Sequence, residues 1–393
     1  MQAERARLAV ASSFVLNGFA FASWVARVAA ARDRLGLGPG RLGLLLLCMT
    51  AGATLTLPAS GALVQRLSPA RAVLAGSALA AAGISCAGAG LGLGSAAVTG
   101  SGLLVLVVGN ALWDVAMNVE GAAVERHLGR VLMPRLHAGF SVGTVAGAAV
   151  GAGCAALAVP VSTQLVVTGP LLLAAVGCAV RAYLPAVAPA LGGSAAARAR
   201  AVWREPRTLA IGLLVMAFAL TEGVANDWLA LAVRDGHRTS DAVGAGVFGA
   251  FVAAMTVMRT AGGALLQRFG RPPVLRGSAV GAAAGLLPVV FGPGLPWAVA
   301  GAVLWGSGAA LGFPVGMSAA ADDPRAAAPR VGVVSTIGYS AFLGGPPLVG
   351  FLAEQVGVVH ALLVVAVALV GGAVLAGVAR PVPDREPAAV AVR

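Results

Sequence analysis

The heptapeptide GALVQRL at residues 61–67 returns as GALLQRF at residues 263–269, 202 positions further along the chain. Each copy ends an apolar run with a Gln-Arg pair. Two weaker echoes have nearly the same offset: GFSVG from Gly139 pairs with GYSAF from Gly338, and Trp24 pairs with Trp228. Three matches at almost one offset indicate a duplicated unit.

The composition predicts that this unit lies in a membrane. Hydrophobic residues make up 59% of the chain and charged residues 11%, whereas a soluble domain carries about 25% charged residues. Apolar runs of about 20 residues, long enough to cross a bilayer as helices, recur throughout. The pattern predicts an all-α polytopic membrane protein. Its expected spans are 7–30, 41–65, 71–94, 98–123, 136–158, 161–184, 208–233, 243–267, 273–292, 296–320, 331–354 and 357–379.

The twelve spans form two groups of six, in residues 1–184 and 208–393, joined by an arginine-rich linker at 185–207. Because six is even, both groups enter the membrane with the same polarity. This predicts a parallel repeat of two six-helix bundles, with a pseudo-twofold axis along the membrane normal and a cavity between the halves.

The arginines predict the orientation. With the N-terminus in the cytoplasm, cytoplasmic loops and tails carry 20 arginines and the opposite side carries 5. We therefore expect a multi-pass protein of a bacterial-type cytoplasmic (inner) membrane with both termini inside. The net charge of +12 does not indicate nucleic-acid binding, because the arginines lie in short loops and not on one soluble module.

The repeated heptapeptide resembles the Gly-x-Leu-x-Asp-Arg-x-Gly-Arg type motif of the major facilitator superfamily, a resemblance that covers nearly the whole chain. The matching residues are Gly61, Leu63, Arg66 and Arg71 in the first copy and Gly263, Leu265, Arg268, Gly270 and Arg271 in the second. Gln65 and Gln267 replace the family's aspartate. Within the superfamily, the segments LWDVAMNVEGAAVERHLGR, EGVANDW and GYSAFLGGPPLVG are most similar to the fucose-permease-related branch and its bacterial inner-membrane relatives. The resemblance implies alternating access, with Arg66 and Arg268 as gate candidates and spans 1, 4, 7 and 10 lining the cavity.

Span 98–123 has a polar face, which is typical of a helix beside a wet cavity. The residues on that face are Asn110, Trp113, Asp114, Met117, Asn118, Glu120 and Gly121. Asp114 lies mid-helix between the two asparagines, so we expect it to carry a coupling proton; a hydrogen-bonded packing role is the alternative. Glu120 lies near Arg126, and a gate ion pair is as good a prediction as a proton role.

Span 208–233 adds Glu222 and Asn226, which share a helical face, followed by Asp227 and Trp228. Two acids within one span are expensive, so we expect Glu222 to bind a proton or substrate. Asp227 is expected to approach an arginine. Trp228 is expected either to stack on a substrate or to anchor the helix at the interface.

Span 7–30 places Asn17, Phe21 and Trp24 on one stripe, which the resemblance to the major facilitator superfamily implies faces the cavity. Arg27 could bind an anionic substrate, pair with Asp227 or extend to the headgroups. Arg259 lies deep within span 243–267 and is expected to pair with an acid, the alternative being a substrate anion.

Two further residues complete the candidates. Tyr339, in span 331–354, is a further cavity candidate. His137 stands beside Arg130 and Arg135 and is assigned to a cytoplasmic loop.

These features predict a proton-coupled secondary active transporter, working by alternating access, for a small polar or amphipathic solute. The alternatives are efflux of a drug or metabolite by antiport and a non-transporting membrane sensor. An enzyme is not expected, because the chain has no lysine for a phosphate-binding loop and no His-Cys metal spacing. The expected partners are the lipid bilayer, the solute and protons, with no cofactor, metal or nucleic acid, and the protein is expected to be a monomer.

Overall fold

The computed structural model describes residues 2–37, 39–185 and 200–381, which are helices and short connections without a strand. Eleven helices in these ranges are long and apolar enough to cross a membrane. The 29-residue α3 (Pro39–Leu67) occupies the place of the second predicted span. The all-α polytopic fold predicted from the sequence is confirmed.

The helices occur in two groups. The first contains α1 (Gln2–Val25), α2 (Val28–Leu35), α3, α4 (Pro69–Gly92), α5 (Ala96–Leu128), α6 (Met133–Ala156) and α7 (Val161–Ala179), which η1 (Val180–Ala182) extends. The second contains α9 (Pro206–Val224), η2 (Ala225–Leu229), α10 (Ala230–Gly236), α11 (Asp241–Phe269), α12 (Arg271–Phe291), α13 (Leu295–Ala309), α14 (Gly312–Ala320), α15 (Ala327–Val356), α16 (Val358–Ala361), α17 (Val364–Leu375) and η3 (Ala376–Ala379).

Local sequence signals explain where several helices begin and end. The Ser95 hydroxyl accepts a hydrogen bond from the Val98 N–H and caps α5. Gly129 ends the same helix in the left-handed conformation, with φ of 61°. α5 thus continues five residues beyond the predicted span 98–123, because its last turn is polar and hydropathy does not detect it.

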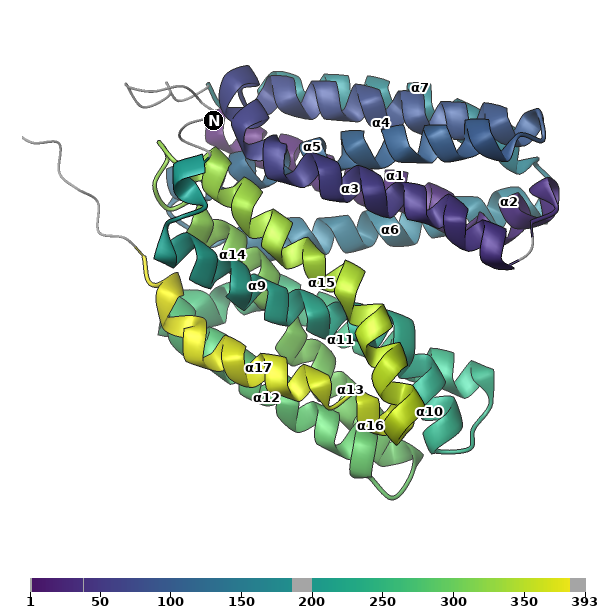
Figure 1. Ribbon diagram of the computed structural model, residues 1–393. Helices are drawn as coiled ribbons and strands as arrows, with labels where there is room; N and C mark the ends of the chain where they lie inside the picture. The colour runs from purple at the N-terminus through teal and green to yellow at the C-terminus, as the bar shows by residue number, and fades with distance from the viewer. Residues whose placement is uncertain (1, 38, 186–199, 382–393) are drawn as a thin grey trace, which may run out of the picture.

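Figure 1 shows α1–α7 as one bundle and α9–α17 as another. We call the end where the bundles meet, which also holds the N-terminus, the closed end. The opposite end, where they diverge, is the open end. The contacts between bundles are made by α15 with α3 and α5, by α6 with α11, and by α14 with α5 and α6. The predicted linker falls largely on 186–199, outside the described residues, so the boundaries 184/185 and 207/208 remain a prediction.

The glycines of the repeated heptapeptide lie at the two seams between bundles. A Cβ on Gly61 would lie 2.5 Å from the Ala328 carbonyl oxygen of α15, so α3 approaches this far only because residue 61 has no side chain. A Cβ on Gly263 of α11 would lie 3.6 Å from the Val131 carbonyl oxygen of the first bundle. The repeat therefore marks where each bundle contacts the other.

Glycines also bring helices together within a bundle. A Cβ on Gly143 of α6 would come within 1.9 Å of the Val15 carbonyl oxygen of α1, and a Cβ on Gly18 of α1 within 2.2 Å of the Phe140 carbonyl oxygen. This backbone contact is the small-residue packing typical of membrane helices.

Candidate functional site

Asp114 joins the two bundles near the middle of α5. Its side chain is buried, with 7% of its surface exposed. The Tyr339 hydroxyl of α15 donates a hydrogen bond to Asp114 Oδ2 at 3.0 Å. Asn118 Nδ2, one turn along α5, donates to Asp114 Oδ1 at 3.3 Å and to the Asp114 carbonyl oxygen at 2.9 Å. A carboxylate buried at this depth is therefore bonded to both halves of the molecule.

His137 extends this polar chain and corrects the expectation that it lies in a loop. It lies in the second turn of α6, is buried, and its Nε2 is 3.2 Å from Asn118 Oδ1. Its ring contacts Phe14 and Phe313 edge-on, with centroids 5.0 and 5.4 Å away. The sequence did contain a signal for this helical position, because His137, Ser141 and Thr144 have the spacing of one helical face. The neighbouring arginines favoured the loop instead.

A second polar connection crosses between the bundles at Arg259 of α11. Its Nη2 forms an ion pair with Glu222 Oε2 of α9 at 2.7 Å. Its Nη1 donates to Ser141 Oγ of α6, and its Nε to the Ala310 carbonyl oxygen, both at 3.3 Å. Arg259 is 5% exposed. The structure thus gives this buried arginine the acidic partner expected from the sequence.

An aromatic row lies beside these polar groups. From Phe313 the ring contacts continue to Tyr339, at 5.4 Å, and then to Phe342, at 5.9 Å. Phe342 is 37% exposed. The row joins the buried histidine to an accessible aromatic surface, and Tyr339 belongs to both the row and the Asp114 connection.

The other candidates of α1 and α5 lie inside the first bundle. Asn17 Nδ2 donates to Asn110 Oδ1 at 3.0 Å and ties the two helices together. Trp24, Trp113 and Met117 are buried, whereas Phe21 is 39% exposed. Of the predicted stripe on α1, the structure exposes only Phe21 in this conformation.

The remaining candidates of the predicted span 208–233 lie in η2, where the helix type changes after α9. Residues 225–229 form a single π-helical turn, a feature frequent at functional sites. Asn226 and Asp227 are exposed there. Trp228 is half-buried and packs next to Gly350 of α15. Asp227 has no ion pair within the described part of the chain, so the expected arginine partner is not present.

Arg27 and Glu120 differ from their predictions. Arg27 is buried and donates to the carbonyl oxygens of Gly151 and Val159, at 2.9 and 3.0 Å. It therefore fixes the α6–α7 connection, and it neither approaches Asp227 nor extends to headgroups. Glu120 is also buried, and its Oε1 accepts a hydrogen bond from the Leu184 N–H at 2.7 Å, so it holds the end of the first bundle. It forms no ion pair with any residue that the structure describes, so the predicted gate pair is not seen there.

The polar contacts of the closed end lie at residues other than the gate candidates Arg66 and Arg268, whose side chains are exposed. Five residues of the closed end make contacts there, and we call them the closed-end cluster: Glu125, Arg126, Arg271, Ser318 and Asp322. Ser318 donates to Glu125, and Arg126 donates to the Ala321 carbonyl oxygen, both across the bundles. Arg271 pairs with Asp322 at 2.7 Å and lies 4.0 Å from Glu125. Arg271, two residues after the second heptapeptide, therefore makes contacts at this end that Arg268 does not make.

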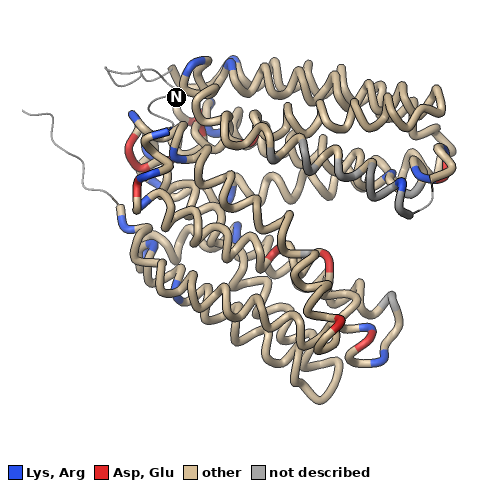
Figure 2. The backbone as a smooth tube through the Cα atoms, in the orientation of Figure 1, with Lys and Arg blue, Asp and Glu red and all other residues tan. Residues whose placement is uncertain are grey.

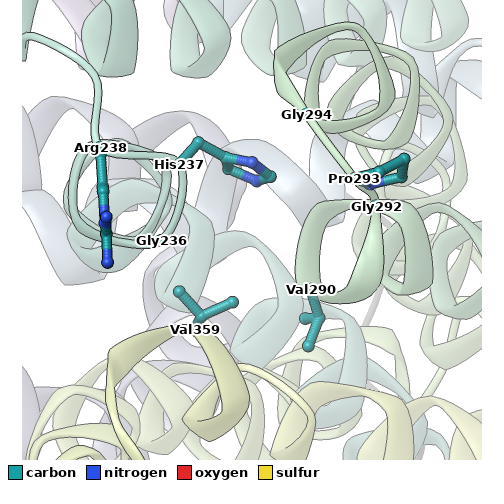
Figure 3. Close-up of a pocket in the computed structure, with 8 residues that line it drawn as sticks. All are labelled: Gly236, His237, Arg238, Val290, Gly292, Pro293, Gly294 and Val359. Atoms are coloured by element: carbon teal, nitrogen blue, oxygen red, sulfur yellow. The ribbon is translucent and has the colours of Figure 1, made fainter.

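A small cavity of about 260 Å³ lies at the open end, away from these residues. Its lining comes from three connections of the second bundle, with His237, Pro293 and Val359 among the residues in Figure 3. His237 Nε2 lies 3.2 Å from the Val289 carbonyl oxygen. The histidine therefore links the α10–α11 connection to the last turn of α12.

Known proteins resemble this chain over most of its length. A family model described as Major Facilitator Superfamily matches residues 211–392. An uncharacterised transporter of Sinorhizobium fredii is 32% identical over 355 residues, covering 88% of this chain and 90% of that protein. An uncharacterised MFS-type transporter of Yersinia pestis is 30% identical over 347 residues, covering 87% of each.

A solved structure shows the same fold at low identity. The E. coli fucose:proton symporter FucP has a TM-score of 0.80 at 14% identity, over 96% of this chain and 98% of that one. Sequence relatives along nearly the whole chain and this shared fold agree with the helices and the repeat described above. The chain therefore belongs to the major facilitator superfamily of membrane transporters.

Proposed function

We propose that this protein is a proton-coupled secondary active transporter that works by alternating access, with Asp114 and Glu222 as the coupling acids. The observation that carries the proposal is the hydrogen bond from Tyr339 to the buried Asp114 across the two bundles. A proton on Asp114 would remove the charge that strengthens this bond. Protonation would then change how firmly the bundles hold each other.

Glu222 is suited to a second, related role. In its ion pair with Arg259 the two charges neutralise each other, and a proton or a charged substrate group at Glu222 would disturb that pairing. Arg259 also bonds Ser141 of the opposite bundle, so a change at Glu222 would be transmitted across the seam. Both acids thus connect a binding event to the contact between bundles.

The uncovered groups near Glu222 support a small polar or amphipathic solute as substrate. Asn226 and Asp227 offer exposed polar groups, and Phe342 offers an exposed ring in contact with Tyr339. Polar groups placed beside aromatic side chains are typical of small-molecule sites.

The distribution of charge supports the orientation with both termini in the cytoplasm. Figure 2 shows the basic segments gathered mainly at the closed end. Arginine-rich ends of membrane helices face the cytoplasm. In this orientation the protein is in an outward-open state, the state in which FucP has also been crystallised.

Proteoliposomes that contain the pH-sensitive dye pyranine test the proposal even though the substrate is not yet identified. A panel of monosaccharides, polyols, amino sugars and amines is added outside, and a coupled solute changes the internal pH. We expect Asp114→Asn and Glu222→Gln to abolish that signal. Asp33→Asn, which changes an exposed acid paired with Arg32, should keep it. A double variant that lacks both acids and still moves protons with the same solute would exclude them as coupling groups.

A further inference from the structure

An apolar groove of about 420 Å³ lies between α11, α12 and α13, apart from the site described above. Leu265 and Phe269 line it from α11, Gly277 from α12 and Leu304 from α13. The leucines and the phenylalanine are between 39% and 53% exposed. The lining comes from the second bundle alone, away from the cavity between the bundles, so these exposed apolar side chains face lipid and the groove opens to the bilayer.

The groove has the length and direction of an acyl chain. Along α11 its lining runs from Phe269, the last residue at the closed end, to Met258. Eleven residues of α-helix span about 16 Å. The groove therefore begins at the end of the membrane helix, where headgroups lie, and runs into the hydrocarbon layer.

A free positive charge stands at the head of the groove. The Arg268 guanidinium lies over the Phe269 ring, 5.1 Å from its centroid. The arginine is exposed, and it takes part in no ion pair with another residue of the described ranges. Arg268 lies in the last turn of α11, at the closed end, where Figure 2 shows most of the basic segments. A negatively charged headgroup complements this position.

Two glycines keep the groove open. A Cβ on Gly277 would meet nothing within 4 Å, and one on Gly281 would meet only a methyl group of Leu304, at 4.0 Å. Both residues line the groove, so a larger side chain at either position would occupy it without striking the backbone. The space is thus a consequence of the sequence, and it can be filled by mutation.

We propose that this groove binds one anionic phospholipid, with an acyl chain along α11 and α12 and its phosphate at Arg268. The site is separate from Asp114 and Glu222, and the proposal does not depend on the coupling mechanism.

Native mass spectrometry of the purified full-length protein tests it. The protein is titrated with phosphatidylglycerol or with phosphatidylcholine of the same acyl chains. We expect the wild type to retain one phosphatidylglycerol with about fivefold preference, the factor expected for one arginine at a membrane surface. Gly277→Leu should lose the retained lipid of both kinds. Arg268→Gln should keep the lipid but lose the preference.

A matched glycine controls for general effects of a new leucine. Gly371 of α17 is exposed, has nothing within 4 Å of a Cβ and lies outside the groove. Gly371→Leu should therefore bind lipid like the wild type. Should Gly277→Leu fail to fold, Gly281→Leu fills the same groove. Equal retention by the groove variants and Gly371→Leu would overturn the site. An unchanged headgroup preference in Arg268→Gln would overturn the role of the arginine.

Discussion

Asp114 is held by two hydrogen-bond partners, one on its own helix and one on the other bundle. Asn118 lies four residues away on the same helix, and Tyr339 lies 225 positions away on the other bundle. The first contact follows from helical spacing and is visible in the sequence. The second depends on how the bundles meet, and no local pattern reports it. The sequence therefore predicted that Asp114 is important but could not predict its tyrosine partner.

The first prediction concerns that tyrosine. Tyr339→Phe keeps the ring and removes the hydroxyl that donates to Asp114, a bond to a charged group worth about 1.5–3 kcal/mol. We expect solute-driven proton flux in pyranine-loaded proteoliposomes to change by about tenfold or more, as that energy implies.

The chain supplies its own control for this substitution. Tyr183 is the other of its two tyrosines, and its hydroxyl donates to Ser13 at 2.7 Å within the first bundle. Tyr183→Phe should leave the flux near that of the wild type. Equal effects of the two substitutions would show that the hydroxyl of Tyr339 has no special role in transport.

The second prediction concerns the buried ion pair. Arg259→Leu leaves Glu222 partly buried without its partner, and removing one member of such a pair costs about 3–5 kcal/mol when burial is complete. With 21% of the Glu222 side chain exposed, we expect a smaller loss of stability. The double variant Arg259→Leu, Glu222→Leu should recover part of it, because neither charge is then isolated. Thermal unfolding measures this; a double variant less stable than Arg259→Leu alone would contradict the account.

At the scale of the helices, the sequence predicted which membrane helices exist and roughly where each one begins and ends. The predicted span 273–292 corresponds to α12, Arg271–Phe291, and 161–184 to α7 with η1, ending at Ala182. Hydropathy detects a helix because apolar side chains must cover its length in lipid. It carries no information about helix type, so the π-helical turn at 225–229 was not predicted. That turn changes the angular relation between Glu222 and Asn226, which regular α-helical spacing would place on one face.

The third prediction concerns the contact of α1 with α6. Gly143→Ala would place a Cβ only 1.9 Å from the Val15 carbonyl oxygen, so the two backbones must separate. We expect a clear loss of thermal stability and of folded yield, since this close packing holds the pair together. Gly153→Ala, on the same helix, meets nothing within 4 Å and should behave like the wild type. If both variants unfold at the same temperature, the contact does not contribute as described.

At the scale of the whole molecule, the repeat explains how two bundles can move against each other. Corresponding glycines of the two copies, Gly61 and Gly263, lie at the two seams, so each bundle presents equivalent helices to the other. Such a pair of seams allows rocking of one repeat against the other. The sequence showed the repeat; which end of the bundles is in contact is a property of the conformation and could not be read from it.

The last prediction concerns the closed-end cluster. Glu125→Gln keeps an acceptor for the Leu132 and Met133 N–H groups but removes the charge that faces Ser318 and Arg271. Losing a charged hydrogen bond across the bundles costs about 1.5–3 kcal/mol. The arrangement in which the closed end is separated should gain population by about tenfold or more.

Spin labels at the open end can measure this shift. Leu157 directly follows α6 and is 80% exposed, and Val356 ends α15 and is 52% exposed. With the native cysteines replaced by serine, labelled cysteines at these two positions report the separation of the bundles by double electron–electron resonance. In Glu125→Gln the distances should move to shorter values, because opening one end brings the other together. Glu205→Gln breaks a pair with Arg330 inside the second bundle and should leave the distances unchanged. Equal distance distributions in Glu125→Gln and the wild type would mean that contacts elsewhere on the seams hold the closed end.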